Sequence, residues 1–161
     1  MSMFQDESYD WRDTYFVLFE SVNRPQLDDV KRMVEQLNPR YEISNLHADS
    51  QGRFESLTIR SPADFTAIDV SFLNGDEVTE HRDAFLKELA TEDRDELEQE
   101  KWERFARCDA RFDVMHFEQV IEADEEEPDA MVDPGALINV IDALVDITHG
   151  VGIDPQSGML M

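Results

Sequence analysis

The residues best suited to chemistry are two histidines and two carboxylates that a predicted strand and helix could bring together. His116 and Glu118 are two positions apart in an alternating stretch, so both side chains would project from one strand face. His81 on a predicted helix and Asp113 on the same strand could complete a site assembled in space. Imidazole and carboxylate groups are zinc ligands, so His116, Glu118 and His81 are candidate metal ligands. The alternative is a strand histidine with a purely structural role.

Three further groups have a simpler structural interpretation. Asp109, Arg111 and Asp113 share a strand face, where they could bind a ligand, although we favour ion pairs. Residues 122–133 contain seven acids and no bases but lack the glycine and alternating ligands of a calcium loop, so we expect a solvated connector. Cys108 has no neighbouring histidine in the sequence to activate it and is expected to be inert.

The sequence contains none of the contiguous motifs that announce common catalytic sites. It has no glycine-rich phosphate loop, no nucleophile elbow, no paired cysteines and no His-Glu-x-x-His helix. We therefore assign no catalytic residue, expect no cofactor and regard an enzyme as the less favoured class.

The charge balance restricts the class of partner. The 38 acidic residues outnumber 14 basic ones and give a net charge of −24, which disfavours binding to nucleic acid or anionic lipid. It favours a cationic partner, unless the acidity serves only solubility in a crowded or salty cytosol. A hydrophobic content of 41% with ten phenylalanines argues against a wholly disordered chain.

The same features predict a cytoplasmic location. A single cysteine fits a reducing compartment, and the first seven residues show no basic region followed by an apolar stretch. No apolar run approaches the roughly 20 residues that span a bilayer, so no membrane association is expected.

The apolar run Tyr15 to Phe19 predicts a central strand covered on both faces, because five consecutive apolar residues cannot face water. Around it, periodicity and turn residues predict further elements. Strands are expected at 41–47, 54–60, 68–72, 112–117 and from 151, and helices at 27–37, 76–90, from Thr91 through Phe105, and from 134 to 147.

This order predicts an α+β fold: a two-layer sandwich, ferredoxin-like in kind, with a mixed, mostly antiparallel sheet and helices packed on it. At 161 residues we expect one domain over 13–161, preceded by an N-terminal arm at 1–12. The C-terminal helix is expected to be the most buried, packing on the sheet through four residues that share a face: Leu137, Ile141, Leu144 and Val145.

The C-terminal tail carries the pattern Thr148-x-Gly150-x-x-x-Asp154-Pro155-x-x-Gly158 after an apolar helix. In this it resembles the ends of several uncharacterised bacterial α+β families, some of them among toxin-immunity or accessory proteins. The resemblance covers about the last thirty residues and implies no catalytic role for any of them. A helix cap and a turn account for the same glycines and proline.

Three functional hypotheses follow. The leading one is a non-enzymatic interaction protein, of immunity or accessory type, that binds a basic protein partner and is itself a monomer or weak homodimer. The second is a small enzyme or ligand- or metal-binding domain with a site around His116 and Glu118. The third is a nucleic-acid mimic that uses the acids between 92 and 103, although Arg94 and Lys101 interrupt that row.

Overall fold

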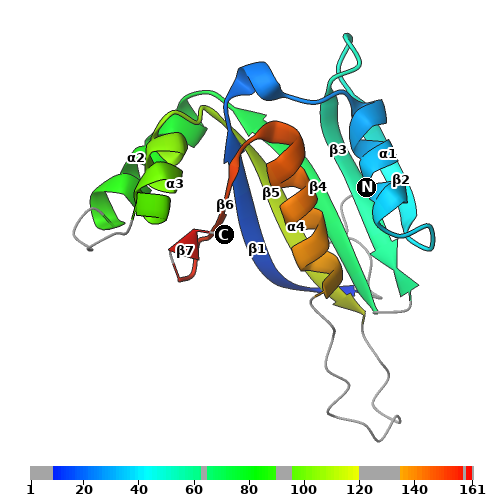
Figure 1. Ribbon diagram of the computed structural model, residues 1–161. Helices are drawn as coiled ribbons and strands as arrows, with labels where there is room; N and C mark the ends of the chain where they lie inside the picture. The colour runs from blue at the N-terminus through cyan, green and yellow to red at the C-terminus, as the bar shows by residue number, and fades with distance from the viewer. Residues whose placement is uncertain (1–8, 63–64, 90–95, 120–134, 158, 161) are drawn as a thin grey trace, which may run out of the picture.

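The computed structural model describes residues 9–62, 65–89, 96–119, 135–157 and 159–160 (Figure 1). Seven strands and four α-helices are assigned within these ranges. In chain order they are β1 (Tyr9–Phe19), the short 3-10 helix η2 (Ser21–Asn23), α1 (Leu27–Leu37), β2 (Glu42–Ala48), β3 (Phe54–Ser61), β4 (Thr66–Asn74), α2 (Asp76–Leu89), α3 (Glu96–Ala106), β5 (Ala110–Gln119), α4 (Gly135–Thr148), β6 (Val151–Asp154) and β7 (Met159–Leu160).

The strands form a single sheet in the order β2-β3-β4-β5-β1-β6-β7, and every pairing among them is antiparallel. β1 lies inside the sheet, between β5 and β6, as the apolar run at its end predicts. Val17 and Phe19 belong to the hydrophobic cluster on one face, whereas Leu18 belongs to a second cluster on the other. The prediction of a central strand covered on both faces is confirmed.

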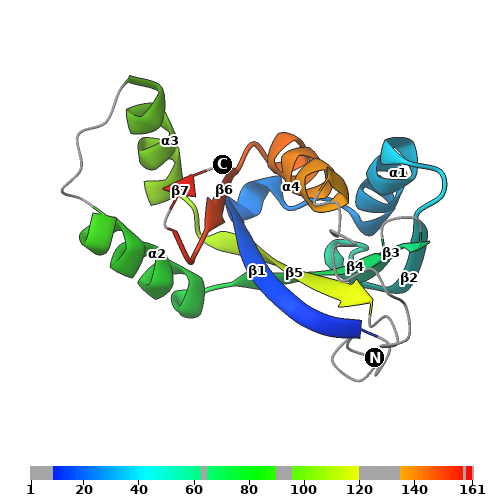
Figure 2. The same ribbon diagram turned by 90° about the horizontal axis from the view of Figure 1, so that it is seen from below.

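Helices α1 and α4 lie side by side over one face of the sheet, which we call the helical face (Figures 1 and 2). The apolar stripe of α1, including Val30 and Val34, packs there together with Leu137, Ile141 and Leu144 of α4. Aromatic rings fill the layer between helices and sheet. Phe112 lies 4.6 Å from Phe19 and 5.3 Å from Phe54, measured between ring centroids. These two layers make the α+β sandwich that the sequence predicts.

The opposite face of the sheet, which we call the polar face, is covered differently. α2 and α3 pack against one end of it and enclose the second cluster, in which Val78 and Phe105 contact the end of β1 and β6. Figure 2 shows this helix pair beside the sheet, away from α1 and α4. The helices therefore occupy both faces, and within the described residues none of them packs over β2 and β3 on the polar face.

The β2–β3 hairpin is fastened to the start of α1. Gly52 turns the hairpin with a φ of 78°, and its carbonyl oxygen accepts a hydrogen bond from the Leu27 amide at 3.0 Å. Arg24 donates twice to the Phe54 carbonyl, at 3.0 and 2.8 Å, and its guanidinium lies 3.8 Å from the centroid of the Phe72 ring. A mostly buried arginine thus connects the segment before α1 to two strands.

The C-terminal helix α4 is buried on one side, as predicted, but exposed on the other. Leu137, Ile141 and Leu144 are buried and Val145 is half-buried, but Ile138 is 44% exposed, so the helix is not enclosed all round. His149 then adopts the left-handed conformation that ends the helix, with a φ of 52°.

Gly150 lets the chain pass close to the central strand immediately after α4. A Cβ atom built at Gly150 would lie 2.3 Å from the Leu18 carbonyl oxygen. Only a glycine therefore fits where the chain leaves α4 to pair with β1.

Some expectations concern residues outside this description. The acidic segment 122–133 and the predicted cap Thr91 both lie outside the described residues. The N-terminal arm was expected over 1–12, and its last four residues, 9–12, are part of β1. The strand order by itself does not establish a ferredoxin-like arrangement.

The packing of α4 predicts a large difference between two substitutions on the same helix. Leu144→Ala should lower the free energy of unfolding by about 2 to 5 kcal/mol, because it leaves a cavity against the sheet. Ile138→Ala, at an exposed position of the helix, should lower it by less than about 1 kcal/mol. Urea unfolding of both variants measures the two values, and equal losses would contradict this packing.

Candidate functional site

A row of polar side chains crosses the polar face from one strand to the next. The register pairs His47 of β2 with Ser56 of β3, Ser56 with Ser71 of β4, and Ser71 with Asp113 of β5. Directly opposed residues in neighbouring antiparallel strands project to the same side of the sheet. An imidazole, two hydroxyls and a carboxylate are therefore aligned across four strands.

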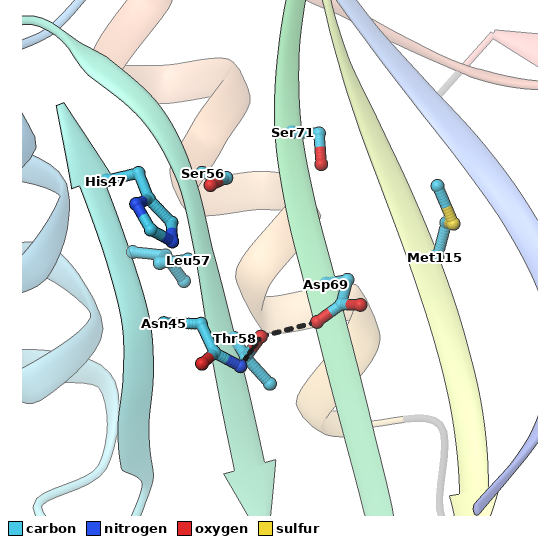
Figure 3. Close-up of a pocket in the computed structure, with 8 residues that line it drawn as sticks. All are labelled: Asn45, His47, Ser56, Leu57, Thr58, Asp69, Ser71 and Met115. Carbon is cyan, nitrogen blue, oxygen red and sulfur yellow. Dashed lines mark hydrogen bonds between the residues drawn. The ribbon is translucent and has the colours of Figure 1, made fainter. Parts of the chain in front are cut away.

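A pocket of about 240 Å³ opens beside this row (Figure 3). It is formed by β2, β3, β4 and β5, and six of its eight lining residues have polar side chains. The lining residues are Asn45, His47, Ser56, Leu57, Thr58, Asp69, Ser71 and Met115.

Two hydrogen bonds in the pocket form a chain that leads to Asp69. The Asn45 Nδ2 donates to Thr58 Oγ1 at 3.2 Å, and the Thr58 hydroxyl donates to Asp69 Oδ1 at 2.6 Å. The sequence of donors ends on the Asp69 carboxylate, which is only 9% exposed, and Thr58 is 2% exposed. The Thr58 hydroxyl thus holds the buried Asp69 carboxylate in place.

An irregularity in β2 brings Asn45 to this position. The register shifts between Ser44 and His47, which oppose Thr58 and Ser56, so β2 contains one more residue than β3 over this stretch. Asn45 has a φ of 52°, a left-handed conformation that asparagine tolerates better than most residues. Bulges of this kind redirect side chains, and here the Asn45 amide contributes to the pocket wall.

A second polar cluster lies farther along the same face, where α2 meets the sheet. The guanidinium of Arg111 donates from Nε to Asp113 Oδ1 at 2.6 Å, and its Nη1 lies 2.8 Å from His81 Nδ1. The same guanidinium lies 4.3 Å from the centroid of the Phe16 ring, and the His81 ring stacks on Phe85 at 4.7 Å. Arg111 is buried, so the cluster fixes α2 to the sheet.

Electrostatics in this cluster favour a neutral imidazole. Burial, followed by the charge of Arg111, lowers the pKa of His81 below its ordinary value. Because a guanidinium can only donate, the His81 Nδ1 must accept its hydrogen bond. Burial raises the pKa of Asp113, and the neighbouring Arg111 opposes that shift.

His116 is buried on the helical face in a different chain of hydrogen bonds. Its Nδ1 lies 3.1 Å from Asp13 Oδ1, and Asp13 Oδ2 accepts from the Tyr15 hydroxyl at 3.0 Å. Its Nε2 has no hydrogen-bond partner among the described residues. Burial, together with Asp13, raises the pKa of Tyr15 to about 12. This histidine is a buried structural group whose second nitrogen is unpaired.

The structure does not bring the three candidate metal ligands together. Glu118 forms an exposed ion pair with Arg12 at 3.2 Å, His116 contacts Asp13, and His81 contacts Arg111. Within the described ranges, no group of three His, Cys, Asp or Glu side chains is placed to hold a metal ion.

The other groups singled out in the sequence have structural partners. Asp113 pairs with Arg111, in line with the favoured interpretation as an ion pair. Asp109, just before β5, accepts hydrogen bonds from the Ser21 amide at 2.7 Å and the Ser21 hydroxyl at 2.8 Å. Cys108 is buried, and burial raises the pKa of its thiol to about 12, so it is protonated at neutral pH.

Sequence reasoning did not find the pocket. Asn45, Ser56, Thr58, Asp69 and Ser71 are scattered over three strands and form no motif. The one available signal is Asp69, a carboxylate between the apolar Ile68 and Val70 of a predicted strand.

Comparison with known proteins adds no assignment: no family model, no curated protein and no solved structure matches the chain. Among the described residues, none of the helices has the length and apolar character needed to cross a membrane.

The environment of His116 predicts a pH-dependent stability. Burial lowers its pKa below 6.5 despite the opposing effect of Asp13, so the unfolded chain takes up the proton more readily than the folded one. Stability contributed by this residue should therefore be lost as the pH falls from about 7.5 to about 5.5. Urea midpoints should show a smaller loss over this range in His116→Gln than in the parent chain.

A matched control is His149→Asn, which removes an exposed histidine and keeps a residue suited to the left-handed conformation. This variant should retain the parent's pH dependence. If His116→Gln and His149→Asn change the slope equally, the buried imidazole is not its source. An NMR titration placing the His116 pKa above 6.5 would also contradict the prediction.

Proposed function

We propose that this protein is a non-enzymatic interaction module of the cytosol that binds a basic protein partner on the polar face of its sheet. The observation that carries the proposal is the buried Asp69 carboxylate in a polar pocket, on the part of that face that no described helix covers. The C-terminal tail is compatible with a protein of immunity or accessory type. We also propose that the fold is ferredoxin-like in kind.

Charge supports a basic partner over a neutral one. The chain has a net charge of −24, so its field attracts cations over the whole surface and speeds their approach. On the polar face, Arg111 offsets the charge of Asp113, and Asp69 accepts a hydrogen bond from the Thr58 hydroxyl.

The two alternatives have weaker support. An enzyme or metal site around His116 and Glu118 would need these side chains to act together, but they contact Asp13 and Arg12 respectively. A nucleic-acid mimic would need an unbroken row of acids on α3, where Arg104 instead pairs with Glu100 at 3.3 Å. We therefore place the function at the polar face.

A lysine-rich peptide and a glutamate-rich peptide of equal length test this proposal. The lysine-rich peptide should bind at about 50 mM salt and weaken at about 500 mM salt, because exposed charges become screened. The glutamate-rich peptide should not bind. Fluorescence anisotropy measures both, and failure of the lysine-rich peptide to bind at low salt would contradict the proposed function.

The position of the peptide-binding surface is tested by adding one positive charge at either of two positions. Ser56→Arg places it on the polar face, whereas Asn139→Arg places it on the exposed side of α4. Both variants have the same net charge, so a general field effect should weaken peptide binding equally. If the partner binds the polar face, Ser56→Arg should weaken binding several-fold more than Asn139→Arg.

A further inference from the structure

We propose that His81 is a pH-operated link between α2 and the sheet. The neutral imidazole holds α2 to Arg111 of β5, whereas the protonated imidazole loses this contact and pairs with Glu77 of its own helix. Protonation thereby loosens α2 from one end of the polar face while the sheet stays folded. This inference goes beyond the proposed function and does not depend on the binding of a basic partner.

The contact between His81 and Arg111 requires an unprotonated imidazole nitrogen. The Arg111 Nη1 lies 2.8 Å from His81 Nδ1, and a guanidinium has donors only. His81 Nδ1 therefore accepts, and the neutral ring carries its proton on Nε2. A proton added at Nδ1 removes this hydrogen bond and places two cations in contact. Protonation of His81 and its contact with Arg111 thus exclude each other.

Arg111 is the fixed member of this pair. Only 7% of its side chain is exposed, and its Nε donates to Asp113 Oδ1 at 2.6 Å. Its guanidinium also lies 4.3 Å from the centroid of the Phe16 ring. These contacts are made within the sheet, to β5 and β1, so they resist displacement of the guanidinium. When the two cations repel each other, the imidazole is therefore the group that moves.

Other contacts of His81 divide between the sheet and its own helix. On the sheet side, the ring meets the edge of Phe16 at 5.5 Å between centroids. On the helix side, it stacks on Phe85 at 4.7 Å, and Glu77 lies one turn earlier on α2. The helix-side contacts move together with α2, whereas the sheet-side contacts do not. Protonation therefore weakens the attachment of α2 but leaves the surroundings of His81 within the helix intact.

The charged groups with the largest effect on His81, among the described residues, come from two elements. On β5, Arg111 opposes protonation and Asp113 favours it, and on α2 Glu77 favours it. Phe16, which faces the ring from β1, is uncharged. Because Asp113 is already engaged by Arg111, we assign Glu77 as the partner of the imidazolium. A glutamate four residues before a cation is a favourable pair on a helix.

Further contacts keep α2 from leaving the sheet altogether. Val78 is fully buried in the hydrophobic cluster that also contains Leu18 and Phe105. Arg82 Nη1 donates to the Cys108 carbonyl at 2.8 Å. Neither contact involves a group that titrates between about pH 5 and about pH 7. The change is thus a local opening of α2 and not a loss of the fold.

Amide hydrogen exchange on the full chain measures this opening, because a helix released from its packing is marginal in water. Burial and Arg111 lower the pKa of His81 below 6.5, so the opening takes up a proton. Its equilibrium constant should rise by up to about tenfold per pH unit below about pH 6.5. From about pH 7 to about pH 5, amides 79–86 should lose about tenfold more protection than those of α4, which follow global stability.

Three glutamine substitutions identify the groups responsible. His81→Gln keeps an oxygen that can accept from Arg111 but cannot be protonated, so the additional loss of protection in α2 should disappear. His47→Gln removes an exposed histidine of β2 and should leave that loss unchanged. Glu77→Gln removes the partner of the protonated imidazole and should reduce the loss by about twofold.

Equal losses of protection in α2 and α4 would show that α2 is not released, and the proposal would be wrong. An additional loss in α2 that persists in His81→Gln would assign the opening to another group, such as Asp113, and would also overturn it. An NMR titration of the imidazole nitrogens in the parent chain needs no variant. A His81 that stays neutral down to about pH 5, or takes up a proton while α2 keeps its protection, contradicts the link.

Discussion

The pairing of β1 with β5 is the constraint on which the rest of the structure depends. The two strands are hydrogen-bonded from Tyr9 opposite Gln119 to Phe19 opposite Ala110, with one irregularity near Trp11. β4 continues from the other side of β5 and β6 from the other side of β1, so every remaining strand is placed relative to this pair. Because side chains alternate along β1, its pairing also fixes which residues face α4 and which face α3.

One set of strands therefore produces two surfaces with different chemistry. On β4, Ile68 and Val70 face the helices, and Asp69 and Ser71, in the alternate positions, line the pocket. A shift of one residue in register would exchange the two sets and place a carboxylate in the hydrophobic core. The packing of α1 and α4 on the helical face thus stabilises the strands that form the polar pocket on the opposite face.

Local patterns in the sequence were enough to predict most elements of the fold. The run ending at Phe19, the turn at Gly52 and the apolar face around Leu144 each carry their information within a few neighbouring residues. The site required information of another kind. Whether Asn45, Thr58 and Asp69 meet depends on strand register and on a bulge, which arise from pairings between distant segments. His116 and Glu118 show the opposite case. Their spacing places them on one strand face, but in the structure they contact different partners.

The bulge at Asn45 in β2 also affects whether molecules associate at high concentration. Of the described strands, β2 pairs only with β3 and so forms one border of the sheet, while the two-residue β7 forms the other. A long, flat border strand invites a neighbouring molecule to extend the sheet, and repeated extension leads to fibres. The left-handed Asn45 interrupts the regular backbone pattern on one border, and brevity limits the other. Strong mutual repulsion between copies acts in the same direction. A concentrated preparation should therefore remain dispersed.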